Sequence, residues 1–241
     1  GPLAVNGFLG GIEEAKMHEL DVDFTSAKIV LKKGKPKKPK VYISSSLNTD
    51  VSHKKRYGES VYEQLKAQFQ DDLVELAANE SNVWCRDYMP VRNAKGKWVQ
   101  FKYAPSYMIE SEKWKARIPD MKLLHQEIGL SDVHFSEIIL DGGNVERNGN
   151  TAIVSDRVFR DNKPTGSDNI IVHEQELIGQ LKKELAVNRL IVIPQYPYDF
   201  TGHVDGLVRF VDEDTILIND YHQEWISISK DTNSYRRQIM E

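Results

Sequence analysis

The stretch Thr-Gly-His-Val-Asp-Gly, residues 201–206, places an imidazole and a carboxylate two residues apart, at His203 and Asp205. The apolar run that follows, 207–211, is typical of a strand. Residues two apart on a strand point to the same face, so we expect His203 and Asp205 side by side, with Val204 on the opposite face. A polar pair on a buried face needs a hydrogen-bonded partner or a ligand. The alternative is an exposed edge strand on which the two residues are incidental.

A second stretch, Trp-Cys-Arg-Asp-Tyr-Met-Pro, combines an aromatic ring with a carboxylate. Trp84 could contact a flat cation through its ring, and Asp87 could accept paired hydrogen bonds from it. Pro90 fixes its own φ and ends the turn. The alternative is a surface ion pair between Arg86 and Asp87 beside a half-buried Trp84.

The third stretch, Asp-Gly-Gly-Asn at 141–144, follows the apolar run 138–140. Adjacent glycines permit backbone conformations that are closed to other residues. This pattern predicts Asp141 at a strand end, aimed into a cleft, although a tight hairpin turn would carry the same residues. All three stretches bring a carboxylate to a strand end, and one adds an imidazole. Such a set suits a cationic substrate and a proton-transfer step.

The apolar periodicity indicates which elements hold these stretches. Apolar residues at helical spacing predict amphipathic helices over 58–70 and 174–185. The predicted strands are 25–31, 40–44, 73–77, 98–103, 136–140, 151–155 and 189–193, with a partly helical segment at 113–128. This alternation favours an α/β or α+β fold with its motifs at strand ends.

Composition narrows the class of protein. The 241 residues are 40% hydrophobic and 28% charged, which is typical of a soluble globular protein. A net charge of −4 gives no reason to expect a nucleic-acid partner, and no apolar run approaches a membrane span. One cysteine excludes an intrachain disulfide and favours a reducing, cytoplasmic compartment. We expect the Lys-rich segment 32–40 to be a solvated loop rather than a polyanion-binding patch.

The three motifs, in this order, resemble those of the agmatine deiminase and bacterial peptidylarginine deiminase family. They are Trp-x-Arg-Asp-x-x-Pro, Leu-Asp-Gly-Gly-Asn and Gly-His-Val-Asp-Gly-Leu-Val-Arg-Phe-Val-Asp, and the resemblance runs from about residue 60 to about residue 220. It implies a pentein fold, which is an α/β propeller of ββαβ-type modules. It also implies hydrolysis of a guanidinium group to a ureido group and ammonia, without a metal or an organic cofactor.

The resemblance implies a role for each matching residue. His203 would be the general acid and base, and Asp87 and Asp205 would hold the guanidinium nitrogens. Asp141 stands where many relatives have Glu, and would orient the substrate or the neighbouring His203. Trp84 would line the pocket. The implied catalytic residues are Asp87, Asp141, His203 and Asp205, and the implied substrate-binding residues are Trp84, Asp87, Asp205, Gly142 and Asn144.

The sequence departs from the family pattern at the nucleophile. The family uses a Cys close to its C-terminus, whereas this chain has one Cys, Cys85, and ends at Glu241. We therefore expect a single, incomplete pentein-like domain over 1–241, without the last module, with 1–24 as a tag remnant or leader. Such a chain would be inactive alone and prone to self-association through open strand edges. We expect Cys85 to be a small buried hydrophobe.

Two alternatives and the substrate stay open at this point. The chain could be a catalytically inactive protein that binds guanidinium compounds or arginine side chains, or an interaction module that reuses the fold. Arg147, Arg157 and Arg160 could bind a substrate α-carboxylate, but we expect them to be solvated. Agmatine, free arginine and peptidyl arginine are therefore alternative substrates.

Overall fold

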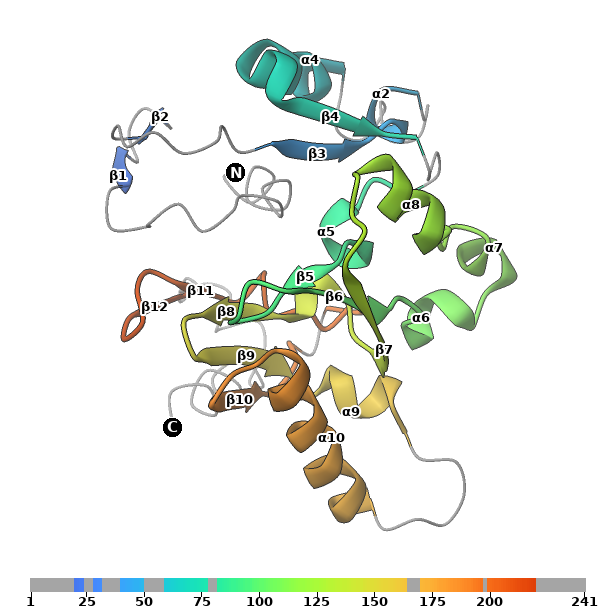
Figure 1. The fold of residues 1–241 in the computed structure, drawn as a ribbon, viewed down its shortest axis with the longest axis vertical. Helices are drawn as coiled ribbons and strands as arrows, with labels where there is room; N and C mark the ends of the chain where they lie inside the picture. The colour runs from blue at the N-terminus through green and yellow to red at the C-terminus, as the bar shows by residue number, and fades with distance from the viewer. Residues whose placement is uncertain are drawn as a thin grey trace, which may run out of the picture. The chain divides into compact units, whose positions relative to one another are not determined.

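The computed structural model describes residues 20–23, 28–31, 40–49, 59–77, 82–163, 170–196 and 199–219. The chain divides into two compact units, Gly1–Cys85 and Arg86–Glu241, which are described one at a time (Figure 1). A single, incomplete catalytic domain over 1–241 stays a prediction. The Lys-rich segment falls outside the described residues except for Lys40, which is exposed.

The described residues of the first unit form two pairs of strands. β1 (Leu20–Asp23) and β2 (Lys28–Leu31) are antiparallel, and β3 (Val41–Ser44) and β4 (Leu73–Leu76) are parallel. Between β3 and β4 lie α2 (Ser46–Thr49), α4 (Glu59–Phe69) and the 3-10 helix η2 (Gln70–Asp72). The strands and the helix predicted here from periodicity are confirmed over the described residues. One buried hydrophobic cluster of this unit consists of Val41, Ile43, Leu47, Tyr62 and Val83.

The second unit repeats one arrangement of three strands. β5 (Val91–Arg92) is antiparallel to β6 (Trp98–Lys102), which is parallel to β7 (Val133–Ile139). In the same way, β8 (Glu146–Asn148) is antiparallel to β9 (Thr151–Ser155), which is parallel to β10 (Arg189–Ile193). In each case helices connect the second strand to the third (Figure 1). This is the ββαβ module that the family resemblance implies, and it occurs twice among the described residues.

Helices provide the crossovers, and two further short elements complete the unit. α6 (Ser106–Ile109), α7 (Glu112–Lys115) and α8 (Met121–Glu127) connect β6 to β7, while α9 (Arg157–Asp161) and α10 (Ile170–Glu184) connect β9 to β10. The α5 helix (Cys85–Tyr88) precedes the first module, and the 3-10 helix η3 (Gly142–Asn144) separates the two modules. β11 (Val208–Phe210) and β12 (Ile216–Ile218) form an antiparallel hairpin.

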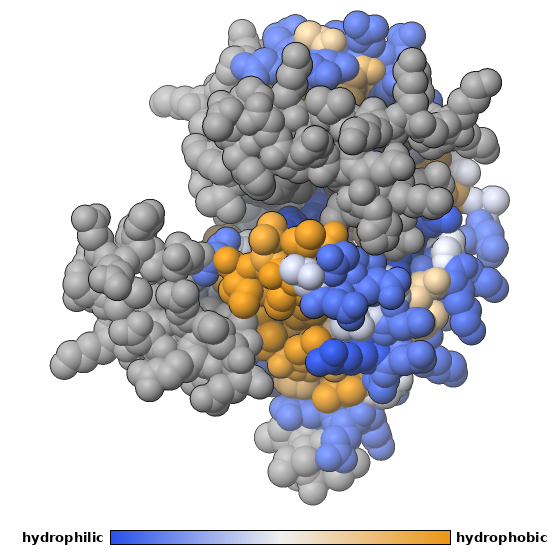
Figure 2. All heavy atoms as spheres, turned by 90° about the vertical axis from the view of Figure 1, so that its left-hand side faces the viewer, coloured by the Kyte–Doolittle hydropathy of each residue, from blue (hydrophilic) through white to orange (hydrophobic). Residues whose placement is uncertain are grey.

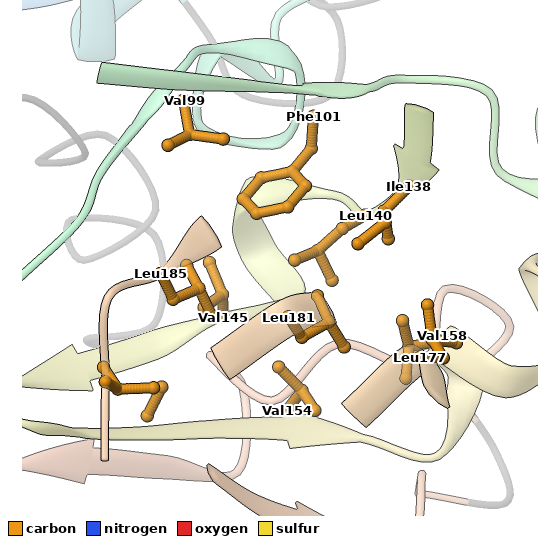
Figure 3. Close-up of a cluster of buried hydrophobic side chains, with 12 residues drawn as sticks. Val99, Phe101, Ile138, Leu140, Val145, Val154, Val158, Leu177, Leu181 and Leu185 are labelled. Carbon is orange, nitrogen blue, oxygen red and sulfur yellow. The ribbon is translucent and has the colours of Figure 1, made fainter. Parts of the chain in front are cut away.

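A hydrophobic core joins the two modules of the second unit. Val99 and Phe101 of β6 pack with Val154 of β9, with Leu181 of α10 and with Leu185, the residue after α10 (Figure 3). The leucine face predicted for this helix is confirmed, because Leu177, Leu181 and Leu185 are all buried. Each fully buried leucine contributes roughly 2 kcal/mol through the hydrophobic effect. The core therefore fixes the strand ends that carry the functional residues.

The β11–β12 hairpin exposes hydrophobic side chains. Ile216, Leu217 and Ile218 of β12 are 38%, 58% and 40% exposed. Among the described residues β12 pairs with β11 alone. Hydrophobic side chains also gather on the side of the molecule that faces the viewer in Figure 2. Open apolar surface was expected, whereas self-association stays a prediction.

Within the described ranges, every helix is too short or too polar to cross a lipid bilayer.

Candidate active site

The segment that carries His203 forms a turn rather than the predicted strand. The backbone N–H groups of Leu207 and Val208 both donate to the carbonyl of Val204, at 2.8 and 3.0 Å. Asp199 accepts bonds from the backbone N–H of Thr201 and of His203, at 2.9 and 3.2 Å. Such side-chain bonds compete with strand pairing for the backbone.

The prediction of a strand over 201–206 is therefore wrong, because β11 begins only at Val208. Gly202 adopts a φ of +68°, which a glycine tolerates in a turn. The turn still buries Val204 in a core cluster with Ile153, and it directs His203 and Asp205 to different partners.

His203 contacts two carboxylates, one on each ring nitrogen. Its Nε2 lies 2.8 Å from Oδ2 of Asp141, and its Nδ1 lies 3.6 Å from Oδ1 of Asp87. Asp141 follows the end of β7, and Asp87 lies in α5, so three distant segments of the second unit meet at the imidazole. The structure thus brings together one residue from each of the three sequence motifs.

The two glycines of the third motif make this approach possible. A Cβ at Gly142 would collide with the backbone carbonyl of Arg86. A Cβ at Gly143 would meet Nδ1 of His203 and would lie 2.6 Å from Oδ1 of Asp87. Close backbone approach, not a hairpin turn, therefore explains the Gly-Gly pair. Instead of a hairpin, the pair opens the 3-10 helix η3.

Asp205 belongs to an adjoining network of two arginines and two carboxylates. Its Oδ2 lies 3.1 Å from Nε of Arg86, and Nη2 of Arg86 donates to Glu146 at 2.6 Å. Arg209 of β11 also bonds Glu146, and its Nη2 lies 3.9 Å from Asp205. The backbone N–H of Asp205 donates to the carbonyl of Gly143 at 3.0 Å. The network links the His203 turn to α5 and β8.

Burial and the carboxylates act in opposite directions on His203. Burial alone would lower the pKa of His203, but Asp87, Asp141 and Asp205 outweigh it and raise that pKa to about 9. Burial also raises the pKa of Asp87 to about 7, although the positive charge of His203 opposes this. Burial raises the pKa of Asp205 as well, against the effect of Arg86. Three carboxylates thus act on one imidazole.

Three other residues singled out in the sequence lie in different surroundings. Trp84 belongs to the first unit and is 46% exposed. Asn144 is buried, and its Oδ1 accepts the backbone N–H of Ser155 at 2.9 Å, which ties η3 to β9. Cys85 is buried at the start of α5, as expected.

The expectation that the arginines after the Gly-Gly turn are solvated is wrong for Arg157. Arg157 is 4% exposed. Its guanidinium contacts Asp161 at 3.1 Å, the carbonyl of Phe200 at 2.9 Å and Oγ of Ser106 at 2.9 Å. Arg160 is exposed, as expected, and Arg147 is half-buried and bonds backbone carbonyls. Arg157 has its donors engaged within the fold.

Sequence reasoning missed two residues of the cluster. Tyr107 of α6 donates its hydroxyl to Oδ2 of Asp141 at 2.6 Å, and nothing in its sequence neighbourhood signals this contact. Glu146 lies two residues after the Asp-Gly-Gly-Asn motif, and it was not linked to Arg86 because the two are 60 residues apart. Within the described residues, no group of three or more His, Cys, Asp or Glu side chains is arranged to hold a metal ion.

Comparison with known proteins identifies the family of this chain. Residues 43–240 match the family model of the Porphyromonas-type peptidyl-arginine deiminases. The chain belongs to this family. The match covers the three motifs and confirms the resemblance of the sequence. No curated protein matches the chain.

Two solved structures share the fold of this chain. Agmatine deiminase of C. jejuni is 17% identical, with a TM-score of 0.52 over 79% of this chain and 66% of that one. Agmatine deiminase of Enterococcus faecalis is 18% identical, with a TM-score of 0.55 over 77% of this chain and 59% of that one. The chain thus spans 66% of the length of the first enzyme and 59% of the length of the second.

Proposed function

We propose that the chain carries the guanidinium-binding and proton-transfer residues of a guanidine deiminase, which hydrolyses a guanidinium group to a ureido group and ammonia. The main support for this proposal is that Asp87 and Asp141 each contact one of the two ring nitrogens of His203. Membership of the peptidyl-arginine deiminase family supports it, as does the shared fold with proteins named agmatine deiminases.

The charge of the cluster favours a guanidinium ligand. A guanidinium group is planar and presents several N–H donors, which match carboxylate oxygens in pairs. Oδ1 of Asp141 is buried and has no hydrogen-bond partner among the described residues, so it is an acceptor that a bound N–H would satisfy. A cation beside Asp87 would also stabilise the charged form of this carboxylate, whose pKa burial raises to about 7.

In the proposed reaction His203 moves the protons. A thiolate attacks the guanidinium carbon, and the C–N bond breaks as His203 gives its proton to the departing ammonia. Water then attacks the same carbon and returns a proton to His203, and the C–S bond breaks to release the ureido product. The raised pKa of His203 keeps it protonated before the first step.

In our proposal, none of the 241 residues supplies the thiolate that the first step requires. Cys85 is their only thiol, and it is buried at the start of α5. Reactive cysteines are partly exposed, whereas Cys85 is buried. We therefore propose that this chain binds guanidinium compounds without hydrolysing them.

Binding and turnover measured together test this proposal. The purified chain is titrated with agmatine, with arginine and with a blocked arginine peptide, while melting temperature, ammonia and ureido product are recorded. The proposal requires saturable stabilisation by at least one of the three, without ammonia. Stabilisation by none of them would refute the guanidinium site. Ammonia release that disappears in Cys85→Ser would refute the assignment of Cys85.

A further inference from the structure

Tyr107 shares one carboxylate oxygen with His203. Its hydroxyl lies 2.6 Å from Oδ2 of Asp141, the same atom that lies 2.8 Å from Nε2 of His203. Burial and the charge of Asp141 raise the pKa of Tyr107, so the phenol keeps its proton and acts as a donor. Asp141 therefore accepts a bond from a neutral hydroxyl beside the imidazole.

Arg157 and Phe200 hold the ring of Tyr107 in place. The guanidinium carbon of Arg157 lies 5.3 Å from the centre of the Tyr107 ring, and the ring of Phe200 packs edge-on at 5.5 Å. Arg157 also bonds the hydroxyl of Ser106, the residue before Tyr107, and the carbonyl of Phe200. One buried arginine thus fixes both the α6 residue and the segment that leads to His203.

The hydroxyl constrains where protons lie in the cluster. Oδ2 of Asp141 already accepts the proton of the phenol, so it acts as an acceptor towards its other neighbour, Nε2 of His203. Nε2 of His203 then keeps its proton as a donor to Oδ2. The proton that the imidazole gives up is the one on Nδ1, the nitrogen that faces Asp87 at 3.6 Å.

We propose that Tyr107 is a positioning residue that keeps the Nε2 proton of His203 on the imidazole, so that His203 exchanges protons with a substrate only through Nδ1. The exchange with a substrate rests on the proposed deiminase function. The protonation of His203 in the free protein does not, and it can be measured without any ligand.

The groups that face His203 come from several elements. Asp87 lies in α5, Asp141 follows β7 and Tyr107 lies in α6, while Asp205 and Asp199 belong to the same segment as His203. Arg86 contacts this set through Asp205. Replacing the phenol alone leaves all of these charges in place, which isolates the effect of one hydrogen bond.

The test compares two tyrosine variants by NMR. Titration of the ¹⁵N-labelled imidazole, assigned with His203→Gln, gives its pKa and shows which nitrogen is protonated above that pKa. Tyr107→Phe removes one donor from Asp141, so we expect the pKa of His203 to rise by about one unit. Tyr62→Phe is the matched control, because Tyr62 donates to Glu75 at the same 2.6 Å in the other unit. It should leave His203 unchanged.

Each outcome of these measurements either supports or overturns the inference. An unchanged pKa of His203 in Tyr107→Phe would overturn it, and so would an equal change in Tyr62→Phe. If Tyr107→Phe does not fold, the native chain still tests the proposal. A neutral His203 ring that carries its proton on Nδ1 rather than on Nε2 above its pKa would overturn it. Absence of guanidinium binding would instead count against the proposed function. It would not affect the pKa of His203 or the position of its proton.

Discussion

Nε2 of His203 lies 2.8 Å from Oδ2 of Asp141, although 62 residues separate the two in the chain. Oδ1 of Asp87, from a third segment, lies 3.6 Å from the other ring nitrogen, Nδ1. An imidazole held between two buried carboxylates stays protonated well above its usual range. This arrangement underlies the proposed binding of a guanidinium cation and the proposed transfer of a proton.

Loss of the charge on Asp141 should lower the pKa of His203. In Asp141→Asn we expect that pKa to fall by about two units, because an adjacent charge shifts a pKa by that order. NMR titration of the imidazole measures it. Asp120→Asn is the control, because Asp120 is an exposed helix cap and Asn caps as well as Asp. A pKa that stays near 9 in Asp141→Asn would contradict the account.

Stability should fall as pH rises. The pKa of His203 is raised from 6.5 to about 9 in the folded state, so its contribution is complete below pH 6.5 and is lost as pH rises through 9. The raised pKa of Asp87, about 7 against 3.8, acts in the same direction between pH 4 and 7. We expect His203 to account for a loss of about 3 kcal/mol between pH 6.5 and 9.

Urea unfolding at a series of pH values measures this dependence. His203→Gln should flatten the curve in that range. An unchanged slope in His203→Gln would exclude this histidine as its source.

A side chain at position 143 should disrupt the cluster. The Cβ in Gly143→Ala would press on Nδ1 of His203 and Oδ1 of Asp87. We expect a loss of about 1–3 kcal/mol in stability, as for other overpacked positions, and weaker guanidinium binding. Gly206→Ala is the matched control, since a Cβ there meets no atom within 4 Å. Equal effects of the two variants on unfolding and on binding would argue against close packing at Gly143.

Arg86 should contribute to stability through its two carboxylates. Arg86→Ala leaves Glu146 with Arg209 and leaves Asp205 without its 3.1 Å partner. We expect destabilisation of about 2–3 kcal/mol, which is less than for a fully buried pair because these side chains are partly exposed. Denaturant unfolding measures it. The exposed Arg189 in β10 gives the control, and Arg189→Ala should change stability by less than about 0.5 kcal/mol. Similar losses of stability in the two variants would mean that water screens the ion pairs of Arg86.

Periodicity and motif order predicted much of this fold. The helix around Leu181 and the strand 189–193 follow from side-chain patterns that burial enforces, and the structure confirms both. The strand expected at His203 failed because Asp199 bonds the backbone N–H groups of the turn, a local competition that hydrophobic patterns do not register. Tyr107 was missed because its contact with Asp141 depends on how α6 packs, which no local spacing encodes.

Calorimetric titration with agmatine and with 1,4-diaminobutane tests the central claim most directly. The two ligands share a four-carbon chain and an amine, and they differ in the guanidinium group. We predict that agmatine binds at least tenfold more tightly, and that Asp87→Asn removes this preference because Asp87 pairs with the planar N–H groups. Equal affinity for the two ligands, or a preference that persists in Asp87→Asn, would contradict a guanidinium site beside His203.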